Sequence, residues 1–513
     1  MDRYSEVERK FDADPGALLP DLSGVAAAVS EAVESQLDAT YFDTADTRLA
    51  RHHITLRRRT GGDDAGWHLK LPAGVDERTE VRLPLGRATH TVPVALAREV
   101  RALVRDRPLV PIAVLRTTRI ERRLLDGDGT TLATIADDTV VGQRLAVGAV
   151  QESTWREVEV ELVDGDRSLL DAVSSQLRAG GLTPSGSSSK LARVLGDSAQ
   201  STTEAAPQAM SSAGRVTAGA VVLAHLRGQV DKLVMHDRGA RVDEPDAVHQ
   251  MRVATRRLRS ALATYRPLLD RERTDPVRAE LKWLGQVLGR SRDTEVLHWR
   301  LRDLVAAQPV ELVLGPVGAR VDLELLDRHR GAHADLVAAL GGDRYFRLLD
   351  ALDTVLTEAL LTARAGKPAA AQLPALVGCA AGRVGRAARA VAYRTPQERN
   401  QGLHEVRKSA KRARYAAESA VPVSGKPAAR LAERMEALQD VLGEHQDSVA
   451  AQSLLLELAM AAHASGENAF TYGLMYAQER TRAHDTRRTY EPTLRKASTT
   501  KARRWTQEKF ALS

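Results

Sequence analysis

The stretch EVERK, residues 6–10, places Glu6, Glu8 and Lys10 at alternate positions just before Pro15 and Gly16. Successive side chains of a β-strand point to opposite faces, so these three charged groups would share one face of a strand. A single charged stripe is typical of a solvated sheet face, because one-sided sheets are common. This strand alone therefore does not indicate a binding site.

The same alternation recurs along the chain up to about Leu195, in short segments separated by Gly, Pro and Asp. The further strand-borne charges are Arg57, Arg59, Lys70, Arg78, Glu80, Arg82, Arg116, Arg119, Glu157, Glu159 and Glu161. Short alternating runs bounded by turn residues predict β-strands. Because nearly every run carries a charged stripe, the pattern favours a functional face over a merely solvated one.

The two signs of charge are segregated among these strands. Carboxylates gather on the first and last runs, whereas the runs between them carry mainly Arg and Lys. Carboxylate clusters bind hard divalent cations such as Mg²⁺ or Mn²⁺, and guanidinium and ammonium groups bind phosphate oxygens. Inside a closed barrel such like charges would need counter-ions. The segregation therefore predicts a site for a metal-bound phosphate compound.

With these residues, segment 1–197 resembles the CYTH, or triphosphate tunnel metalloenzyme, domain. The motifs that carry the resemblance are Glu6-Val-Glu8-Arg-Lys10, Tyr41-Phe-Asp43-Thr44, Leu56-Arg57-Arg-Arg59, Leu69-Lys70, the stretch from Arg116 to Arg119, Glu157-Val-Glu159-Val-Glu161 and Ser189-Lys190. The resemblance implies an antiparallel eight-stranded β-barrel tunnel, with some helix (α+β), that binds triphosphates together with a divalent metal.

The resemblance also implies roles for individual side chains. The metal ligands would be Glu6, Glu8, Glu157 and Glu159, and the catalytic residues Glu6, Glu8 and Lys10. The phosphate ligands would be Arg57, Arg59, Lys70, Arg82, Arg116, Arg119 and Lys190. Arg82 stands where many members carry a carboxylate, which argues against a second metal. Because no base-reading motif supports a cyclase, hydrolysis of inorganic triphosphate or a related triphosphate is favoured; the general base stays open.

The composition changes after this segment. Residues 198–213 are mostly small and polar without apolar periodicity, which predicts a linker. Residues 214–505 are rich in Ala, Leu, Arg and Glu with apolar spacing near 3.6, which predicts an all-α domain. The chain is thus expected to have two domains of different architecture.

The predicted helical domain repeats itself. HQMRVATRRLR at 249–259 is echoed by HEVRKSAKRAR at 404–414, and LGQVLGRSRD at 284–293 by LQDVLGEHQD at 438–447. Each half therefore carries a basic helix followed by a second helix with a Leu-Gly pair and an Asp. This period predicts duplicated helical bundles.

The basic helices carry their charges on single stripes. At about 100° per residue, His249, Arg252, Arg256 and Arg259 share one helical face, and His404, Arg407, Lys411 and Arg414 share another. Neighbouring like charges repel by a few tenths of a kcal/mol per pair. A solvated face remains the alternative for one stripe, but its duplication favours a bound anion. Without an HExxH arrangement, the histidines are expected to bind phosphate rather than zinc.

This half resembles the CHAD domain, a family of paired helical bundles that binds inorganic polyphosphate. The resemblance implies that a set of basic residues contacts polyphosphate, with Asp293 and Asp447 orienting the cations. That set is His249, Arg252, Arg256, Arg257, Arg259, His404, Arg407, Lys408, Lys411, Arg412 and Arg414.

Composition limits the remaining alternatives. The net charge of +7 favours anionic partners, and the lone Cys379 excludes an intrachain disulfide framework. No stretch reaches the roughly 20 apolar residues of a membrane span, so the chain is expected in the cytosol, free or at polyphosphate granules. The leading hypothesis is a metal-dependent triphosphatase tethered to polyphosphate, and the alternative is a non-catalytic polyphosphate-binding or granule-associated protein. Nucleic acid is disfavoured, because few aromatic residues are present for base stacking.

Overall fold

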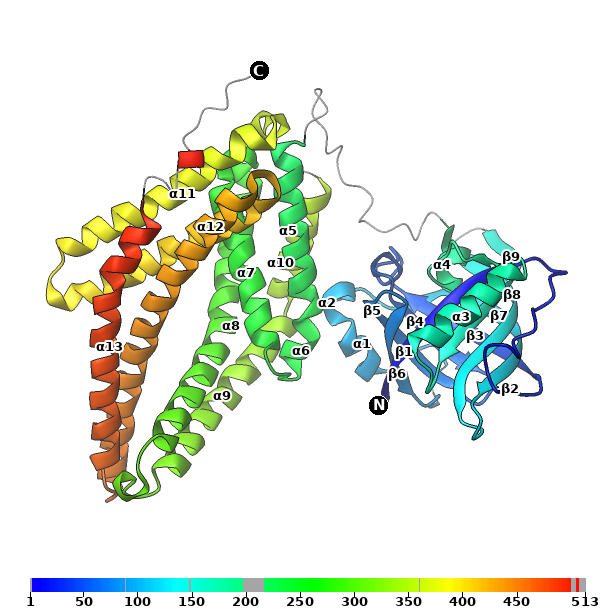
Figure 1. The fold of residues 1–513 in the computed structure, drawn as a ribbon, viewed down its shortest axis with the longest axis horizontal. Helices are drawn as coiled ribbons and strands as arrows, with labels where there is room; N and C mark the ends of the chain where they lie inside the picture. Colours follow the sequence, from blue (N-terminus) through cyan, green and yellow to red (C-terminus); the bar gives the residue numbers. More distant parts are fainter. Residues whose placement is uncertain are drawn as a thin grey trace. The chain divides into compact units, whose positions relative to one another are not determined.

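We describe the protein from a computed structural model, which covers residues 2–87, 89–146, 149–196, 216–358, 360–499 and 504–506. The chain forms two compact units, residues 1–204 and 205–513. The predicted linker at 198–213 lies outside the described residues. Strands build the first unit and helices the second (Figure 1).

The first unit is a closed antiparallel barrel. Its strands are β1 (Asp2–Ala13), β3 (Val33–Asp43), β4 (Thr55–Thr60), β5 (Gly66–Gly74), β6 (Glu77–Leu83), β7 (Val110–Leu125), β8 (Thr131–Ala146) and β9 (Ala149–Leu162). They pair in the order β1-β6-β5-β4-β3-β7-β8-β9, and β9 pairs again with β1. The short strands β2 (Ala28–Val29) and β10 (Thr183–Pro184) lie beside β7 and β1. This confirms the predicted eight-stranded tunnel.

Many of the buried apolar side chains of the barrel strands point outward and are covered by helices. On β1 and β9, Phe11, Val158 and Val160 alternate with the charged residues and pack against α3 (Arg167–Ala179). On β4 and β5, Leu56 and Trp67 pack against α1 (Val94–Glu99) and α2 (Arg101–Val104). Because helices cover these apolar faces, the alternating charged residues are directed inward.

The second unit consists of long helices. They are α5 (Ala218–Met235), α6 (Asp237–Arg241), α7 (Ala247–Thr264), α8 (Arg271–Ala306), α9 (Val317–Gly341), α10 (Asp343–Thr357), α11 (Ala369–Ala392), α12 (Pro396–Ala464) and α13 (Phe470–Ala497). The predicted all-α architecture is confirmed. Among the described residues, no helix combines the length and the apolar character needed to cross a bilayer.

The two sequence repeats form equivalent helical hairpins. In the first, α7 leads through a short turn into α8. In the second, both helices carry the label α12, but Gly425 interrupts it with φ 55° and ψ −139°. Arg414 before the break pairs with Glu436 after it, and Arg407 pairs with Gln446, so the two segments run antiparallel. A positive φ is readily adopted by glycine, which explains the turn at this position.

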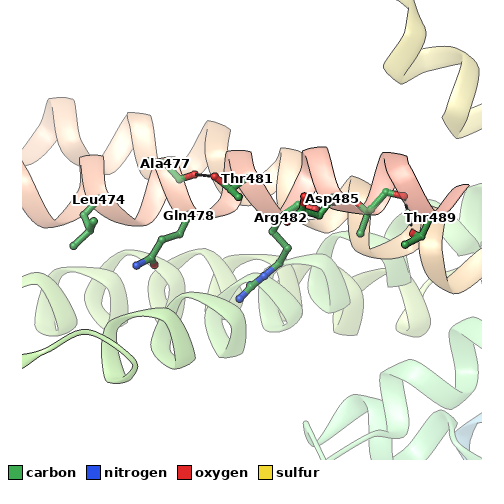
Figure 2. A pocket seen from close by; sticks show the side chains of 8 residues that line it. Leu474, Ala477, Gln478, Thr481, Arg482, Asp485 and Thr489 are labelled. Atoms are coloured by element: carbon green, nitrogen blue, oxygen red, sulfur yellow. Dashed lines mark hydrogen bonds between the residues drawn. The ribbon is translucent and has the colours of Figure 1, made fainter.

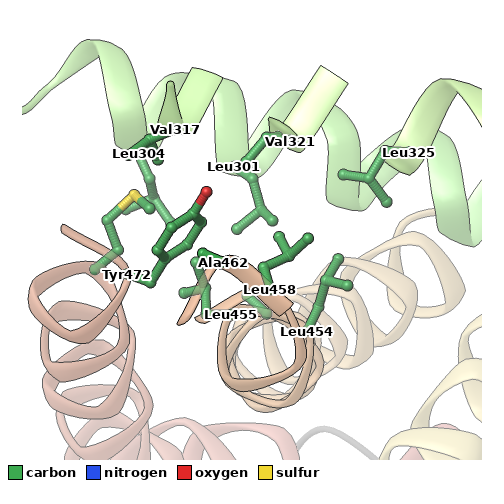
Figure 3. Close-up of a cluster of buried hydrophobic side chains, with 12 residues drawn as sticks. Leu301, Leu304, Val317, Val321, Leu325, Leu454, Leu455, Leu458, Ala462 and Tyr472 are labelled. Carbon is green, nitrogen blue, oxygen red and sulfur yellow. The ribbon is translucent and has the colours of Figure 1, made fainter. Parts of the chain in front are cut away.

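A hydrophobic cluster joins the two hairpins at one end (Figure 3). Leu301 and Leu304 of α8 and Val321 of α9 pack against Leu455 and Leu458 of α12. Tyr472 and Met475 of α13 complete the cluster. Burial of these side chains holds the repeats together away from their basic stretches.

Candidate functional site

The inward faces of the barrel strands enclose a cavity lined largely by charged side chains. The lining residues are Glu6, Lys10, Tyr41, Thr55, Arg57, Arg59, Asp64, Lys70, Arg78, Glu80, Arg82, Arg119, Glu159, Glu161, Ser189 and Lys190. Most of the predicted tunnel residues are among them. Glu8 and Glu157 lie buried beside this lining, whereas Arg116 lies elsewhere.

Lys190 is the most highly connected cation of the cavity. It is the first residue of α4 (Lys190–Leu195), whose N-terminus is capped by the side chain of Ser189. Its Nζ lies 2.9 Å from Asp138, 2.8 Å from Glu157 and 2.7 Å from Glu159. Although burial opposes the charged form, these three carboxylates raise the pKa of Lys190 above its usual value. The ammonium group therefore neutralises part of a buried carboxylate cluster.

Two further lysines hold the carboxylates of β1. Lys10 Nζ lies 2.9 Å from Glu8 Oε2 and also contacts Glu159, and Lys70 Nζ contacts Glu6 Oε1 at 2.5 Å. Burial opposes the charged form of Glu8, but Lys10 and Lys70 outweigh it and lower its pKa to about 2. At neutral pH the β1 stripe thus forms a network of ion pairs.

Two arginines of β4, Arg57 and Arg59, line another part of the cavity. Arg57 donates from Nη1 to the Tyr41 hydroxyl at 3.4 Å, and Arg59 pairs with Asp64. Burial, reinforced by Arg57 and Arg119, lowers the pKa of Arg59 to about 9. A guanidinium group is ordinarily charged at every pH that proteins experience, so this shift reflects burial first and then the positive charges of Arg57 and Arg119 beside it. An anion in the cavity would relieve it.

Arg116 does not join the predicted phosphate ligands. Its side chain is 69% exposed, and its Nε lies 3.7 Å from Asp38 outside the cavity. Arg119, in contrast, lines the cavity and donates two hydrogen bonds to Asp138, at 2.8 and 2.6 Å. The two arginines are three positions apart on β7, and an odd interval places side chains on opposite faces of a strand.

This difference gives a testable prediction. Arg119→Ala is expected to weaken binding of inorganic triphosphate roughly 10- to 150-fold, because a hydrogen bond to a charged group contributes about 1.5–3 kcal/mol. Arg116→Ala is the matched control and should leave the affinity within about twofold. Titration calorimetry of both variants measures this. Equal losses in the two would contradict the assignment of faces.

Sequence reasoning did not select several further buried or cavity-lining carboxylates, among them Asp138, Glu80 and Glu161. Asp138 is fully buried between Arg119 and Lys190. Glu80 and Glu161 lie in stripes that were visible in the sequence, but neither was chosen as a site residue. Burial and the neighbouring Glu6, opposed by Lys70, raise the pKa of Glu161 to about 7. The end of the cavity near Glu6 therefore holds more carboxylate than nearby cations compensate.

The oxygen atoms of these carboxylates suit a hard divalent cation chemically, but the side chains are not arranged around a common point as metal ligands would be. Among the described residues, Glu6 Oε2 is buried without a hydrogen-bond partner, and such an acceptor-only oxygen suits a divalent ion. Yet no three Asp, Glu, His or Cys side chains of this part of the chain converge as ligands of one ion. Lys10 and Lys190 lie among the predicted metal ligands instead, so a metal ion would compete with their ammonium groups.

The helical unit brings cations from both repeats together. Arg252 and Arg256 come from α7, and Arg407 and Lys411 come from α12. Burial, followed by the charges of Arg407, Arg256 and Arg252, lowers the pKa of Lys411 to about 7. We call Arg252, Arg256, Arg407 and Lys411 the central cation cluster. Burial and the three neighbouring arginines together favour the neutral form of this lysine.

Gly289 and Gly443, the glycines of the two Leu-Gly pairs, leave space for the arginine side chains of this cluster. A Cβ atom at Gly289 would lie 3.7 Å from Arg252 Nη2, and one at Gly443 would lie 3.0 Å from Arg407 Nη2. The second contact is tighter than ordinary packing allows, so a larger residue would displace the guanidinium group. The Leu-Gly pairs of both repeats thus allow each arginine to lie across the neighbouring helix.

Carboxylate and amide partners fix the arginines differently in the two repeats. Arg252 donates to Asp293 at 2.7 Å, whereas Arg407 donates to Gln446 at 2.9 Å. Burial raises the pKa of Asp447, although Arg407 opposes the shift. Asp293 thus contacts Arg252 directly, in keeping with its predicted orienting role. Asp447 interacts with Arg407 electrostatically.

Several predicted polyphosphate contacts lie apart from the central cation cluster. Arg257 and Arg414 both pair with Glu418, and Lys408 is exposed and pairs with Glu405. Arg257 and Lys408 follow cluster residues by one position, which rotates them by about 100° around the helix.

Arg259 and Arg412 belong to a second group of cations. Burial and the charges of Arg383, Arg278 and Arg259 lower the pKa of Arg412. Arg278 and Arg383 come from α8 and α11. The predicted basic stripes therefore divide between two clusters.

The two predicted histidines differ in their surroundings. His404 Nδ1 contacts the side-chain amide of Gln446, and His404 lines a surface pocket with Lys408 and His445. Burial, reinforced by Arg292, lowers the pKa of His249. This shift favours the neutral imidazole, which could offer phosphate one ring N–H group.

A surface depression along α13 contains none of the predicted residues (Figure 2). Thr481 donates to the carbonyl of Ala477 within the helix, and Arg482 pairs with Glu479. Because these polar groups are engaged locally, this surface is a weaker candidate than the barrel cavity or the central cation cluster.

Comparison with known proteins agrees with this division of the chain. A CYTH domain model matches residues 5–194, and a CHAD domain model matches residues 224–456. The uncharacterized protein Rv2226 of Mycobacterium tuberculosis is 41% identical over 512 residues, covering 96% of each chain. Among solved structures, PptA from Streptomyces chartreusis has a TM-score of 0.46 and 22% identity, covering 54% of this chain and 99% of its own. The CHAD domain of Ricinus communis has a TM-score of 0.43 and 24% identity, covering 56% and 94%. The chain belongs to the family of proteins in which a CYTH domain is followed by a CHAD domain.

Proposed function

We propose that the CYTH barrel binds inorganic triphosphate or a related triphosphate and hydrolyses its terminal phosphoanhydride bond, and that the CHAD unit binds inorganic polyphosphate. The observation that carries the barrel proposal is the convergence of Arg57, Arg59 and Arg119 on the barrel cavity, where burial and the neighbouring charges lower the pKa of Arg59. Crowded guanidinium groups in a desolvated site are favourable only when an anion compensates them. A chain of linked phosphates supplies several negative charges in a narrow space.

Hydrolysis in this cavity would depend on positioning and charge neutralisation. Phosphoryl transfer requires little covalent chemistry from the protein. Arg57, Arg59 and Arg119 would bind the phosphate oxygens, and Lys10 and Lys190 would neutralise charge at the carboxylate end. CYTH domains are in general metal-dependent; Glu6, Glu8, Glu157 and Glu159 would hold Mg²⁺ or Mn²⁺, which would neutralise phosphate charge and acidify water.

The test is release of phosphate from inorganic triphosphate with Mg²⁺ or Mn²⁺. Glu6→Gln and Glu8→Gln are expected to lower the rate roughly 10- to 100-fold, because each removes a buried carboxylate charge. Glu152→Gln is the matched control, since Glu152 is exposed near the start of β9 and bonds only to Gln143 among the contacts described. Unchanged rates in the Glu6 and Glu8 variants would contradict their proposed role.

A binding protein without catalysis is the second candidate. It is favoured by the lysines that already compensate the barrel carboxylates and by the lack of a converging metal-ligand group among the described residues. In that case the intact protein would bind triphosphate and polyphosphate but release no phosphate with either metal.

The proposal for the CHAD unit rests on the central cation cluster. Three arginines from the two repeats lie close enough to Lys411 for their charges to add to burial in lowering its pKa. Polyphosphate carries about one negative charge per phosphate unit and could compensate several of these groups at once. Competition between polyphosphate and nucleic acid for the intact protein distinguishes this ligand from other phosphate polymers.

A further inference from the structure

A buried histidine and glutamate form a pair in the barrel that the proposed hydrolysis does not use. His68 of β5 and Glu80 of β6 each have side chains that are 1% exposed. His68 Nδ1 lies 2.9 Å from Glu80 Oε1, and His68 Nε2 lies 2.9 Å from the carbonyl oxygen of Asp64. Glu80 also lines the cavity, and its Oε2 accepts from Arg82 Nε.

This geometry requires one proton more than a neutral imidazole and a carboxylate provide. The Asp64 carbonyl can only accept, so Nε2 must carry a hydrogen to bond it. The contact between Nδ1 and Oε1 then needs a second proton, either on the imidazole or on the carboxyl group. Without it, two lone pairs face each other at hydrogen-bond distance. The pair is therefore arranged for a state with no net charge.

The cations around the pair disfavour this uncharged state when no anion is bound in the cavity. Burial lowers the pKa of His68 to about 4 despite its bond to Glu80, and the charges of Arg57 and Arg59 add to this effect. Burial favours the protonated form of Glu80, but the His68 bond, Lys70 and Arg57 lower its pKa overall. These neighbours come from β4 and β5, and β6 adds Arg82. The cations around the pair thus favour a net charge of −1.

We propose that the His68–Glu80 pair takes up one proton when a triphosphate enters the cavity, which removes a negative charge that would otherwise face the phosphate. This inference rests on the proposed triphosphate binding. The bound anion would compensate Arg57, Arg59, Lys70 and Arg82, and these cations would then no longer exclude a proton from His68. The proton comes from solvent, and no covalent bond changes.

The pair also explains why a carboxylate lies among the phosphate-binding cations. With the cavity free of anion, Glu80 partly neutralises Arg57, Lys70 and Arg82. When phosphate takes over that role, protonation of the pair prevents repulsion between carboxylate and phosphate. His68 is accordingly a positioning residue that sets the charge of Glu80.

The test is calorimetric titration of the intact protein with inorganic triphosphate at pH 7, without divalent metal, in buffers of different protonation enthalpy. Protonation of the ligand contributes in every titration, so wild type is compared with His68→Gln and Glu80→Gln. Wild type is expected to take up about one proton more than either variant. Relative to the variants, its affinity should rise up to about tenfold for each unit by which the pH falls across the uptake window.

The two variants and one control separate the outcomes. Glu80→Gln mimics the protonated carboxyl group, so it should bind triphosphate at neutral pH at least as tightly as wild type, without the extra proton. Arg116→Ala should retain the wild-type uptake, because its side chain lies outside the cavity. Equal proton uptake in wild type and both pair variants would overturn this inference alone. Failure of wild type to bind triphosphate both in this titration and in a repeat with Mg²⁺ would instead contradict the proposed function.

Discussion

Lys190→Met is expected to destabilise the barrel by roughly 3–5 kcal/mol at neutral pH, because breaking a buried ion pair leaves uncompensated charge. Asp138, Glu157 and Glu159 would lose the ammonium group that lies within 2.9 Å of each of them. Hydrogen exchange of β8 and β9 measures the effect within the barrel, independently of the helical unit. Lys408→Met is the matched control, since Lys408 is exposed and pairs only with Glu405 among the contacts described.

The pH dependence of this deficit has a definite sign. Although burial opposes it, Lys190 contributes to lowering the pKa of Asp138 and Glu159 below their usual values. Groups with lowered folded-state pKa values stabilise the fold above their unfolded pKa, near 4, and lose that contribution as pH falls. The difference between wild type and Lys190→Met should therefore be largest near neutral pH and shrink in acid. A deficit that grows in acid would contradict this account.

Addition of Mg²⁺ extends the same experiment. If the three carboxylates hold a divalent ion once the ammonium group is removed, Mg²⁺ should restore stability to Lys190→Met more than to wild type. Equal effects of Mg²⁺ on both proteins would indicate that these carboxylates do not form a metal site.

Affinity for polyphosphate is expected to fall up to about 100-fold between pH 7 and pH 9, because binding must protonate Lys411. The pKa of this lysine is lowered from 10.5 to about 7, by burial and then by Arg407, Arg256 and Arg252. Bound phosphate would restore it toward its usual value, so each pH unit above 7 costs up to a factor of ten. Fluorescence anisotropy of labelled polyphosphate measures this dependence.

The free energy of unfolding of the ligand-free protein should rise with pH, opposite to the affinity for polyphosphate. Between about pH 7 and 10.5 the unfolded chain binds a proton at Lys411 that the folded protein does not, so folding becomes more favourable as pH rises. Lys411→Arg is the informative variant, because arginine stays charged throughout this range. Its polyphosphate affinity should lose most of the dependence on pH. A wild-type dependence that persists in this variant would assign the titration to another group.

The sequence predicted the barrel well because its inward residues follow the period of two that strands impose. Glu6, Lys10, Arg57 and Arg59 all lie at such positions and all reach the cavity. The prediction that Arg116 reaches the cavity differs from the structure, because Arg116 was grouped with Arg119 by proximity in sequence although the two are three positions apart. Alternation alone would have separated them.

Other parts of the site depend on tertiary contacts that no local pattern contains. Asp138 adjoins Asp137, and nothing in the sequence distinguishes the one that meets Lys190 from the one that pairs with Arg156. Likewise, His68 is recognisable only because strand pairing brings Glu80 beside it. In the helical unit, the period of 3.6 identified the basic stripes. It did not show that Glu418 engages Arg257 and Arg414 while Arg407 and Lys411 join Arg252 and Arg256.

The equivalence of the two helical hairpins has a consequence for how a polymer could be held. A linear polyphosphate reads the same from either end, unlike a peptide or a nucleic acid strand. Arg252 and Arg407 occupy matching places in the two repeats, each lying across a glycine of its partner helix. A chain held between them would gain nearly the same contacts after end-to-end reversal. The exchange of Asp293 for Gln446 as the arginine's partner and of Arg256 for Lys411 in the cluster distinguishes the two orientations only slightly, so the protein could capture such a chain without first sorting its ends.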